Sequence, residues 1–338
     1  MFPTTDPSEL FRRRDGLYAT DMLITAIGEL DFFNWLAQHP ADRRTVCTGL
    51  DLAARPADVM LTLFSAMGLL DQQNGVFSLS TLAKEHLLGD SAWDLGPYFL
   101  SLKERPICKD ILAVLRTGRP FGWANKPDEQ AWAQAMEDEA FAQKFTAAMD
   151  SRGAYLAPKM AQALDCTSNR RLLDIAGASG VYACAVVQAH AHMRAAVLEK
   201  PPVDKAARRA VERRGLAQRV AVLAGDMFGD PLPSGYDLHL YSHVLHDWDE
   251  AAVQQLLRQS YAALPPGGRL AIHDAHLNAE KTGPLAVAEY SVLLMLSTEG
   301  KCYSVGEMQT MLAQAGFAEA TCVPTVAARS LMIAQKPI

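Results

Sequence analysis

Three acidic residues in the second half of the chain each stand at or just after the end of a short apolar run. They are Asp174, Glu199 and Asp226. If the runs are strands of one parallel sheet, the three carboxylates meet at one edge of that sheet, where nucleotide ligands bind. Glu199 could then accept both hydrogen bonds from a ribose diol. Asp226 could meet an adenine amino group while Met227 packs on the base.

The segment that begins at Asp174 is typical of a strand end, a turn of small residues and a helix start. It carries two glycines, Gly177 and Gly180, rather than the G-x-G-x-x-G pattern with which a dinucleotide site holds a pyrophosphate. The carboxylate of Asp174 would repel a pyrophosphate and attract a cation. A ligand with an ammonium group and a sulfonium centre therefore fits this loop better, and a nicotinamide dehydrogenase is disfavoured.

The elements that must position these residues alternate between strands and helices after Arg170. Strands are expected at 171–175, 195–198, 220–223, 238–241 and 269–273, with helices at 181–190, 203–214 and 250–264. Such alternation predicts a parallel sheet covered by helices on both faces. Helices at 285–296 and 305–315 and strand-like pieces at 320–323 and 330–334 close the chain.

The first part of the chain has a helical pattern. Apolar residues recur at helical spacing over 21–36 and 56–70, and turn residues at 71–75 precede a strand at 76–79. Helix, helix and hairpin form the arrangement of a winged helix. The second helix is apolar rather than basic, which favours a structural or dimer-forming role over DNA binding. Further helices follow to about residue 164, the longest of them at 129–148.

The composition of the 338 residues, 49% of them hydrophobic, is that of an ordinary globular protein. A formal net charge of −6 and a pI near 5.9 argue against nucleic acid as the main partner. The six cysteines are scattered without a C-x-x-C pair, so neither a disulfide framework nor a zinc site is indicated. Because the chain has no signal-like N-terminus and no long apolar segment, we expect a cytoplasmic protein without a membrane partner.

The order of these motifs resembles that of S-adenosylmethionine-dependent O-methyltransferases of the larger, metal-independent kind, which include caffeate, acetylserotonin and bacterial aromatic O-methyltransferases. The motifs concerned are Leu173-Asp174-x-x-Gly177, Glu199, Gly225-Asp226-Met227-Phe228, Leu245-His246-Asp247-Trp248 and Leu264-Pro265-Pro266-Gly267-Gly268. The resemblance implies an α/β class I methyltransferase fold, with a Rossmann-like, mostly parallel sheet in a cofactor-binding catalytic domain at 165–338. It also implies an N-terminal all-helical, winged-helix-like domain at 1–100, through which a homodimer forms, and a helical connector at 101–164 that contributes to the acceptor pocket.

The same resemblance implies roles for individual residues. S-adenosylmethionine would be held by Asp174, Gly177, Gly180, Glu199, Asp226, Met227, Ser242 and Trp248, and S-adenosylhomocysteine would be released. An aromatic small-molecule acceptor, of the phenol or hydroxyquinone type, would lie against Met149, Tyr290, Leu294, Met295 and Tyr303. His246 would be the catalytic base, with Asp247 next to it and Asp274 flanking it. No metal is expected.

The chemistry of methyl transfer supports a histidine base independently of the resemblance. A phenol has a pKa of about 10 and is mostly protonated at neutral pH, whereas imidazole titrates near 6.5. His246 can therefore take the proton as the new bond forms. A carboxylate such as Asp274, hydrogen-bonded to the other ring nitrogen, would fix the tautomer and stabilise the imidazolium.

Two departures from the family pattern bear on these roles. Ala176 and Ala178 stand where the loop often has glycines, and small side chains are expected to preserve the turn. Cys302 stands where many members carry a second glutamate beside the histidine. Some bacterial members also lack that glutamate and have a tyrosine followed by a small hydroxyl residue, as Tyr303-Ser304 does here.

Other interpretations stay open. His246 could be a surface residue that caps the helix near Asp249. Two sets of residues could be considered as metal ligands, although no H-E-x-x-H motif is present: His243, His246 and Asp247, or His273, Asp274 and His276. The acceptor atom could be nitrogen or carbon, or the fold could serve a decarboxylase or a hydroxylase. A winged-helix regulator that senses a small molecule is an alternative of another class.

Overall fold

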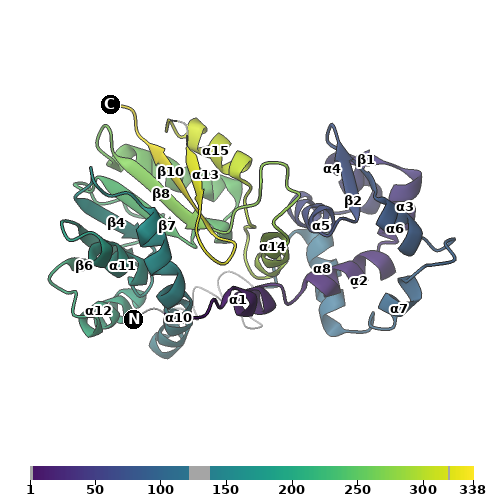
Figure 1. Ribbon diagram of the computed structural model, residues 1–338, viewed down its shortest axis with the longest axis horizontal. Helices are drawn as coiled ribbons and strands as arrows, with labels where there is room; N and C mark the ends of the chain where they lie inside the picture. Colours follow the sequence, from purple (N-terminus) through teal and green to yellow (C-terminus); the bar gives the residue numbers. More distant parts are fainter. Residues whose placement is uncertain (1–2, 122–137, 319) are drawn as a thin grey trace. The chain divides into compact units, whose positions relative to one another are not determined.

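The computed structural model describes residues 3–121, 138–318 and 320–338. The chain divides into two compact units (Figure 1). One comprises Met1–Asp128 and Leu277–Ser304, and the other Glu129–His276 and Val305–Ile338. Among the described helices, none combines the length and the apolar composition that crossing a membrane requires.

The first unit is mostly helical rather than all-helical. Its helices are α1 (Ser8–Asp15), α2 (Ala19–Gly28), α3 (Phe32–Gln38), α4 (Arg43–Leu50), α5 (Ala54–Ala66), α6 (Thr81–His86), α7 (Gly96–Leu100), α8 (Pro106–Thr117) and α14 (Leu285–Ser297). The expected hairpin forms from β2 (Leu70–Gln73) and β3 (Val76–Leu79), and β1 (Ala41–Asp42) adds a third strand in the order β1-β3-β2. The expected helix at 21–36 is two helices, because Asp31 adopts a left-handed backbone with φ 48°.

The helix α14 belongs to the first unit although it follows the sheet strands in sequence. It packs against α5 and α2. The guanidinium of Arg55, on α5, donates to the carbonyls of Met295, Thr298 and Gly300 at 2.8–3.2 Å, near the C-terminal end of α14. Residues 277–304 therefore pack with the N-terminal helices, whereas the expected catalytic domain runs without interruption over 165–338.

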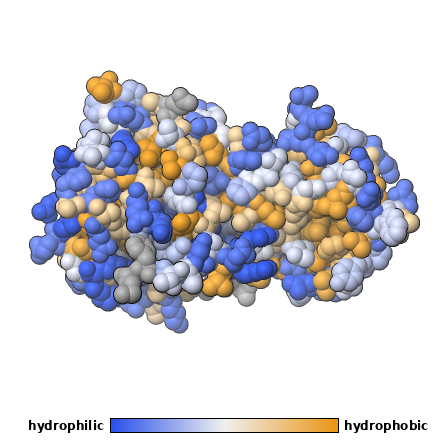
Figure 2. All heavy atoms as spheres, viewed as in Figure 1, coloured by the Kyte–Doolittle hydropathy of each residue, from blue (hydrophilic) through white to orange (hydrophobic). Residues whose placement is uncertain are grey.

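The surface of the first unit carries apolar side chains (Figure 2). Among the described residues, most of the exposed large hydrophobic side chains belong to this unit: Leu10, Leu17, Val76, Leu82, Trp93, Leu95, Tyr98 and Leu102. Tyr98 is 76% exposed and Trp93 is 72% exposed. Exposed apolar surface of this kind is typical of regions that meet another protein.

In the part of the second unit that the structure describes, seven strands form one sheet in the order β6-β5-β4-β7-β8-β10-β9. The strands are β4 (Arg171–Ile175), β5 (Arg194–Glu199), β6 (Val220–Ala224), β7 (Leu238–Ser242), β8 (Arg269–Asp274), β9 (Thr321–Pro324) and β10 (Ser330–Gln335). Neighbouring strands from β6 to β8 pair in parallel, and β10 pairs antiparallel with β8 and with β9. The expected mostly parallel α/β sheet is confirmed.

The helices of this unit are α10 (Glu139–Ala163), α11 (Val181–Ala189), α12 (Val203–Arg213), α13 (Glu250–Ala263) and α15 (Val305–Gln314). Figure 1 shows α11 and α12 together, away from α13 and α15. The strand order reverses between β4 and β7. In open α/β sheets the ligand binds at the carboxyl ends of the strands on either side of such a reversal. The expected helix at 129–148 lies partly outside the described residues, and its described part continues as α10 to Ala163.

Candidate active site

The acidic residues predicted to meet at one edge of the sheet do so. Asp174 lies in β4, Glu199 ends β5, and Asp274 ends β8. Asp226 follows β6 by two residues, and Ser242 ends β7 with its hydroxyl buried. Because these strands are parallel, all five side chains belong to the carboxyl edge of the sheet.

The loop after β4 is shaped around the carboxylate of Asp174. This side chain is fully buried, and its Oδ2 accepts a hydrogen bond of 3.2 Å from the amide of Ala183, on α11. A Cβ at Gly177 would lie 2.5 Å from the carboxyl carbon of Asp174, so any other residue there would displace that carboxylate. Ala176 and Ala178 have φ values of 54° and 50°. The expected turn is preserved, at a cost of roughly 1–2 kcal/mol for each left-handed alanine.

Two carboxyl groups at this edge have a pKa close to neutral pH. Burial raises the pKa of Asp174 to about 7, and the charge of Glu199 acts in the same direction. Burial also raises the pKa of Glu199 to about 7, against hydrogen bonds from the amides of Ala178 at 2.7 Å and Lys200 at 3.1 Å. Asp174 Oδ1 has no hydrogen-bond partner among the described residues. A cationic ligand would supply the missing charge.

The residues that follow β6 are half-buried. The carboxylate of Asp226 accepts a hydrogen bond of 2.9 Å from the amide of Phe228, and this bond, with Lys200 at 3.0 Å, lowers its pKa. The ring of Phe228 packs edge-on against Trp248, with centroids 4.6 Å apart. Met227, between Asp226 and Phe228, is half-buried. Sulfur and aromatic groups beside a carboxylate suit a planar base that carries an amino group.

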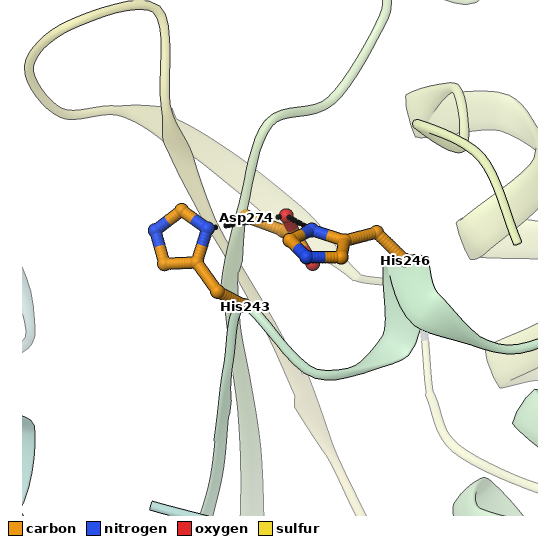
Figure 3. A group of neighbouring side chains, drawn as sticks. All are labelled: His243, His246 and Asp274. Carbon is orange, nitrogen blue, oxygen red and sulfur yellow. Dashed lines mark hydrogen bonds and ion pairs between the residues drawn. The ribbon is translucent and has the colours of Figure 1, made fainter. Parts of the chain in front are cut away.

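His246 is held by Asp274 at the same edge (Figure 3). It lies in the 3₁₀ turn η2 (Leu245–Asp247) after β7, and its Nδ1 is 2.5 Å from Asp274 Oδ1. Both side chains are buried, at 4% exposure each. Burial acts to lower the pKa of His246, but the carboxylates of Asp274 and then Asp247 outweigh it, and the pKa is raised. The imidazole in turn holds the pKa of Asp274 below its ordinary range, against the effect of burial.

This geometry sets the chemistry of the imidazole. An ionised Asp274 accepts the proton on Nδ1, which leaves the lone pair on Nε2. Asp247 Oδ1 is 3.6 Å from His246 Nε2, too far for a hydrogen bond. His246 is therefore not an exposed helix-capping residue, and its arrangement is that of a buried histidine base with an acidic orienter.

A further histidine, His243, faces the same carboxylate (Figure 3). Its Nδ1 is 3.6 Å from Asp274 Oδ1, and its backbone is left-handed, with φ 55°. The structure thus brings together His243, His246 and Asp274, which is neither of the two sets that the sequence suggested as metal ligands. His273 and His276 instead make hydrogen bonds to Thr325 and Ser330, at 3.1 and 2.8 Å.

Sequence reasoning did not identify the contacts between α10 and the loop that joins β4 to α11. Asp150 accepts hydrogen bonds from the hydroxyl of Ser179 and the guanidinium of Arg214. Ser179 is buried in the loop between Gly177 and Gly180. No local sequence pattern marks these three residues, because Ser179 and Arg214 are 29 and 64 residues from Asp150 in sequence.

The residues expected to line the acceptor pocket belong to both units. Tyr290, Leu294 and Met295 are buried on α14 of the first unit, and Tyr303 is buried just after it. Met149 is half-buried on α10 of the second unit. Cys302 is fully buried, and its amide donates a 3.1 Å hydrogen bond to Ser291. That these residues contact the acceptor stays a prediction.

Comparison with known proteins identifies the family. Residues 110–318 match the model of the O-methyltransferase domain. The chain belongs to this family. It is 29% identical over 319 residues to a 3-hydroxy-5-methyl-1-naphthoate 3-O-methyltransferase of Streptomyces sahachiroi, covering 94% of this chain and 91% of the relative. It is also 29% identical over 303 residues to an L-tyrosine C(3)-methyltransferase of Streptomyces lavendulae, covering 87% and 82%.

Solved structures agree with this assignment. An O-methyltransferase family 2 protein of Planctomyces limnophilus, in complex with apigenin, aligns with a TM-score of 0.88 and 32% identity over 99% of this chain and 98% of that one. Other solved relatives hold S-adenosylmethionine or S-adenosylhomocysteine. The chain is therefore a methyltransferase that uses S-adenosylmethionine. The expected family, enzyme class and cofactor are confirmed.

The carboxyl edge fits this cofactor. Asp174 presents a buried carboxylate oxygen with no hydrogen-bond partner among the described residues, beside a loop where a side chain at Gly177 would collide with it. S-adenosylmethionine carries an ammonium group and a sulfonium centre. Asp174 and Glu199, whose pKa is about 7, can ionise when these positive charges approach. Glu199 ends β5, the parallel neighbour of β4, so its carboxylate belongs to the same edge of the sheet as Asp174.

Proposed function

We propose that this enzyme transfers the methyl group of S-adenosylmethionine to a hydroxyl of an aromatic small molecule, of the phenol or hydroxyquinone type. The observation that carries the proposal is the buried His246–Asp274 pair, with nitrogen and oxygen 2.5 Å apart, at the sheet edge that also holds Asp174 and Glu199. An acceptor hydroxyl that is protonated at neutral pH needs a base, and this pair supplies one.

The cofactor, when bound, supplies a methyl group on a sulfonium centre, which makes transfer an in-line displacement with a good leaving group. His246 Nε2 takes the proton of the acceptor hydroxyl while the oxygen–carbon bond forms and the sulfur–carbon bond breaks. Asp274 keeps the proton of the resting imidazole on Nδ1 and stabilises the imidazolium that results. Asp247, beside Nε2, adds negative charge that favours the same imidazolium.

Each predicted cofactor residue has a proposed part in binding. Asp174 meets the positive charge of the methionine moiety, and Gly177 and Gly180 let the backbone approach it. Glu199 binds the ribose. Asp226, with Met227, binds the adenine, and Ser242 and Trp248 close this side of the site. The fully buried Asp174 and the half-buried Asp226 and Met227 support this division.

The acceptor atom is part of the proposal, because relatives of similar identity are named for methylation at oxygen and at carbon. Removal of a phenolic proton also activates the ring carbon beside it. The base alone therefore does not separate the two outcomes. We favour oxygen because most of the named relatives with which the chain aligns are O-methyltransferases.

We also propose a cytoplasmic homodimer formed through the first unit. Exposed aromatic and aliphatic side chains on that unit, such as Trp93 and Tyr98, support a protein interface there. The six cysteines are thiols rather than disulfides, which fits a reducing compartment. Light scattering of the wild type and of Trp93→Ser tests the interface: the wild type should have twice the mass of one chain, and the variant should dissociate at low concentration.

The test of the reaction is a screen with cofactor labelled in its methyl group against phenols, hydroxyquinones and hydroxynaphthoates. Mass spectrometry and NMR of the product identify the methylated atom. An O-methyl product with stoichiometric S-adenosylhomocysteine supports the proposal, and a C-methyl or N-methyl product contradicts it. His246→Gln should bind S-adenosylhomocysteine but turn over about 10²–10⁴ times more slowly. His39→Gln changes an exposed histidine of the first unit and should keep full activity.

A further inference from the structure

His243 has no hydrogen bond that explains its burial. The residue is 7% exposed, and neither ring nitrogen has a hydrogen-bond partner among the described residues. Its ring lies among aromatic neighbours, with centroids 5.6 Å from His246 and 5.3 Å from His273. A buried polar ring on a left-handed backbone is costly unless something binds to it.

The ring is aimed at two other donor groups. His243, His246 and Asp274 each offer one atom, and the three atoms lie within 4.8 Å of one another. The carboxylate stands between the two imidazoles (Figure 3), with Asp274 Oδ1 2.5 Å from His246 Nδ1 and 3.6 Å from His243 Nδ1. Two imidazoles and one carboxylate are a common ligand set for zinc and related transition metals, and they suit magnesium or calcium poorly.

The spacing is close to what such a metal needs. Ligand atoms about 2.1 Å from a tetrahedral zinc ion are about 3.4 Å from one another. The pair at 3.6 Å already meets this spacing, and the pair at 2.5 Å would open by about 1 Å through side-chain rotation. Three protein ligands leave the fourth position to water.

We propose that His243, His246 and Asp274 form an inhibitory site for Zn²⁺ or a similar transition metal. The metal takes the place of the proton that His246 Nδ1 shares with Asp274, and the single proton of the neutral imidazole moves through solvent from Nδ1 to Nε2. An imidazole bound to a metal through Nδ1 carries its proton on Nε2. Nε2 then has no lone pair for the acceptor hydroxyl, so the metal switches off the base without touching the acceptor or the cofactor.

The binding half of this inference stands by itself, and the inhibition half rests on the proposed role of His246 as base. Metal binding is therefore measured directly, with dialysed enzyme, as the visible absorption of bound Co²⁺ and as calorimetric titration with Zn²⁺. The variants are His243→Phe, His243→Asn and, as control, His86→Gln, which removes a half-buried histidine beside Glu85. Calorimetry with S-adenosylhomocysteine confirms that each variant is folded.

We expect one equivalent of either metal per chain in the wild type and in His86→Gln. Both His243 variants should bind at least about tenfold more weakly, since even the outer partners of metal ligands contribute tenfold or more to affinity. Zinc should inhibit the wild type reversibly, with relief by a chelator, and the inhibition constant should rise by a similar factor in the His243 variants. Equal metal affinity in wild type and both His243 variants would overturn the site. Zinc that binds through His243 without slowing turnover would overturn the proposed inhibition, and it would count against the role of His246 as general base.

Discussion

The substitution Asp274→Asn isolates the role of the carboxylate that holds His246. The asparagine has nearly the same shape, so it keeps the packing of a side chain that is 4% exposed, but it carries no charge. The pair is a buried hydrogen bond of 2.5 Å, and it becomes an ion pair when His246 takes a proton. A hydrogen bond to a charged group contributes about 1.5–3 kcal/mol. Losing this in the transition state should lower kcat by about 10- to 150-fold.

The pH profile gives a second readout with a definite sign. The negative charge of Asp274 raises the pKa of His246, so its removal lowers that pKa. Protonated His246 cannot act as a base, and kcat therefore falls on the acid side of the pKa. In Asp274→Asn this acid limb should move to lower pH while the plateau falls.

The assay is kcat between about pH 5 and 9 at saturating cofactor and acceptor, with calorimetric binding of S-adenosylhomocysteine as the check on folding. Asp247→Asn is the matched control, because Asp247 is 3.6 Å from Nε2 and makes no hydrogen bond to it. Its acid limb should also move to lower pH, by less, with a smaller loss of kcat. Wild-type kcat in Asp274→Asn, or an acid limb that moves to higher pH, would refute the reasoning.

Two further predictions concern the cofactor loop and the first unit. Cofactor affinity should increase as the pH rises from about 6 to 8, because burial raises the pKa of Asp174 and Glu199 to about 7 and a cation prefers the ionised carboxyl groups. Calorimetry in buffers of different ionisation enthalpy should detect the protons that these groups release on binding. Asp174→Asn should weaken cofactor binding by about 10- to 150-fold and abolish most of that proton release. Asp58→Ala should lower the free energy of unfolding by about 3–5 kcal/mol, measured with urea, because it removes the buried partner of Lys281 and Lys301, at 2.8 and 2.5 Å. These cations hold the pKa of Asp58 below its unfolded value of 3.8, so its contribution to the free energy of unfolding should be present above that pH and be lost as the pH falls further. Equal urea midpoints for Asp58→Ala and the wild type at neutral pH would count against this prediction.

The strands of the catalytic sheet were predictable because each is a short apolar run with a clear end. The ends of β4 agree with the expectation, and those of β5 to β8 differ from it by at most one residue. The ends of the helices were harder to predict where the backbone conformation or the packing of a single residue determines them. Asp31 interrupts a regular apolar pattern through a left-handed φ that the pattern does not show. Gly153 and Pro158 are typical of helix ends, yet α10 runs through both. A Cβ at Gly153 would lie 2.4 Å from Val181, so this glycine serves the packing of α10 on α11.

The candidate site also has a part that the sequence predicts and a part that it does not. Asp174, Glu199 and Asp226 were predictable because strand ends in a parallel sheet meet at one edge. The pairing of His246 with Asp274 was suggested by a family resemblance, since the two residues are 28 positions apart. The approach of His243 to the same carboxylate depends on a left-handed backbone at the end of β7. No local sequence pattern encodes it.

The most direct test of the general base compares wild type and His246→Gln on acceptors of different acidity. The acceptor from the screen and a fluorinated analogue with a lower hydroxyl pKa are used in single turnovers at saturating cofactor. The account predicts a rate loss of about 10²–10⁴ with the ordinary phenol, whose pKa is near 10, and a clearly smaller loss with the acidic analogue, which needs less help to lose its proton. Equal losses with both acceptors, or no loss with either, would contradict the assignment of His246 as the base.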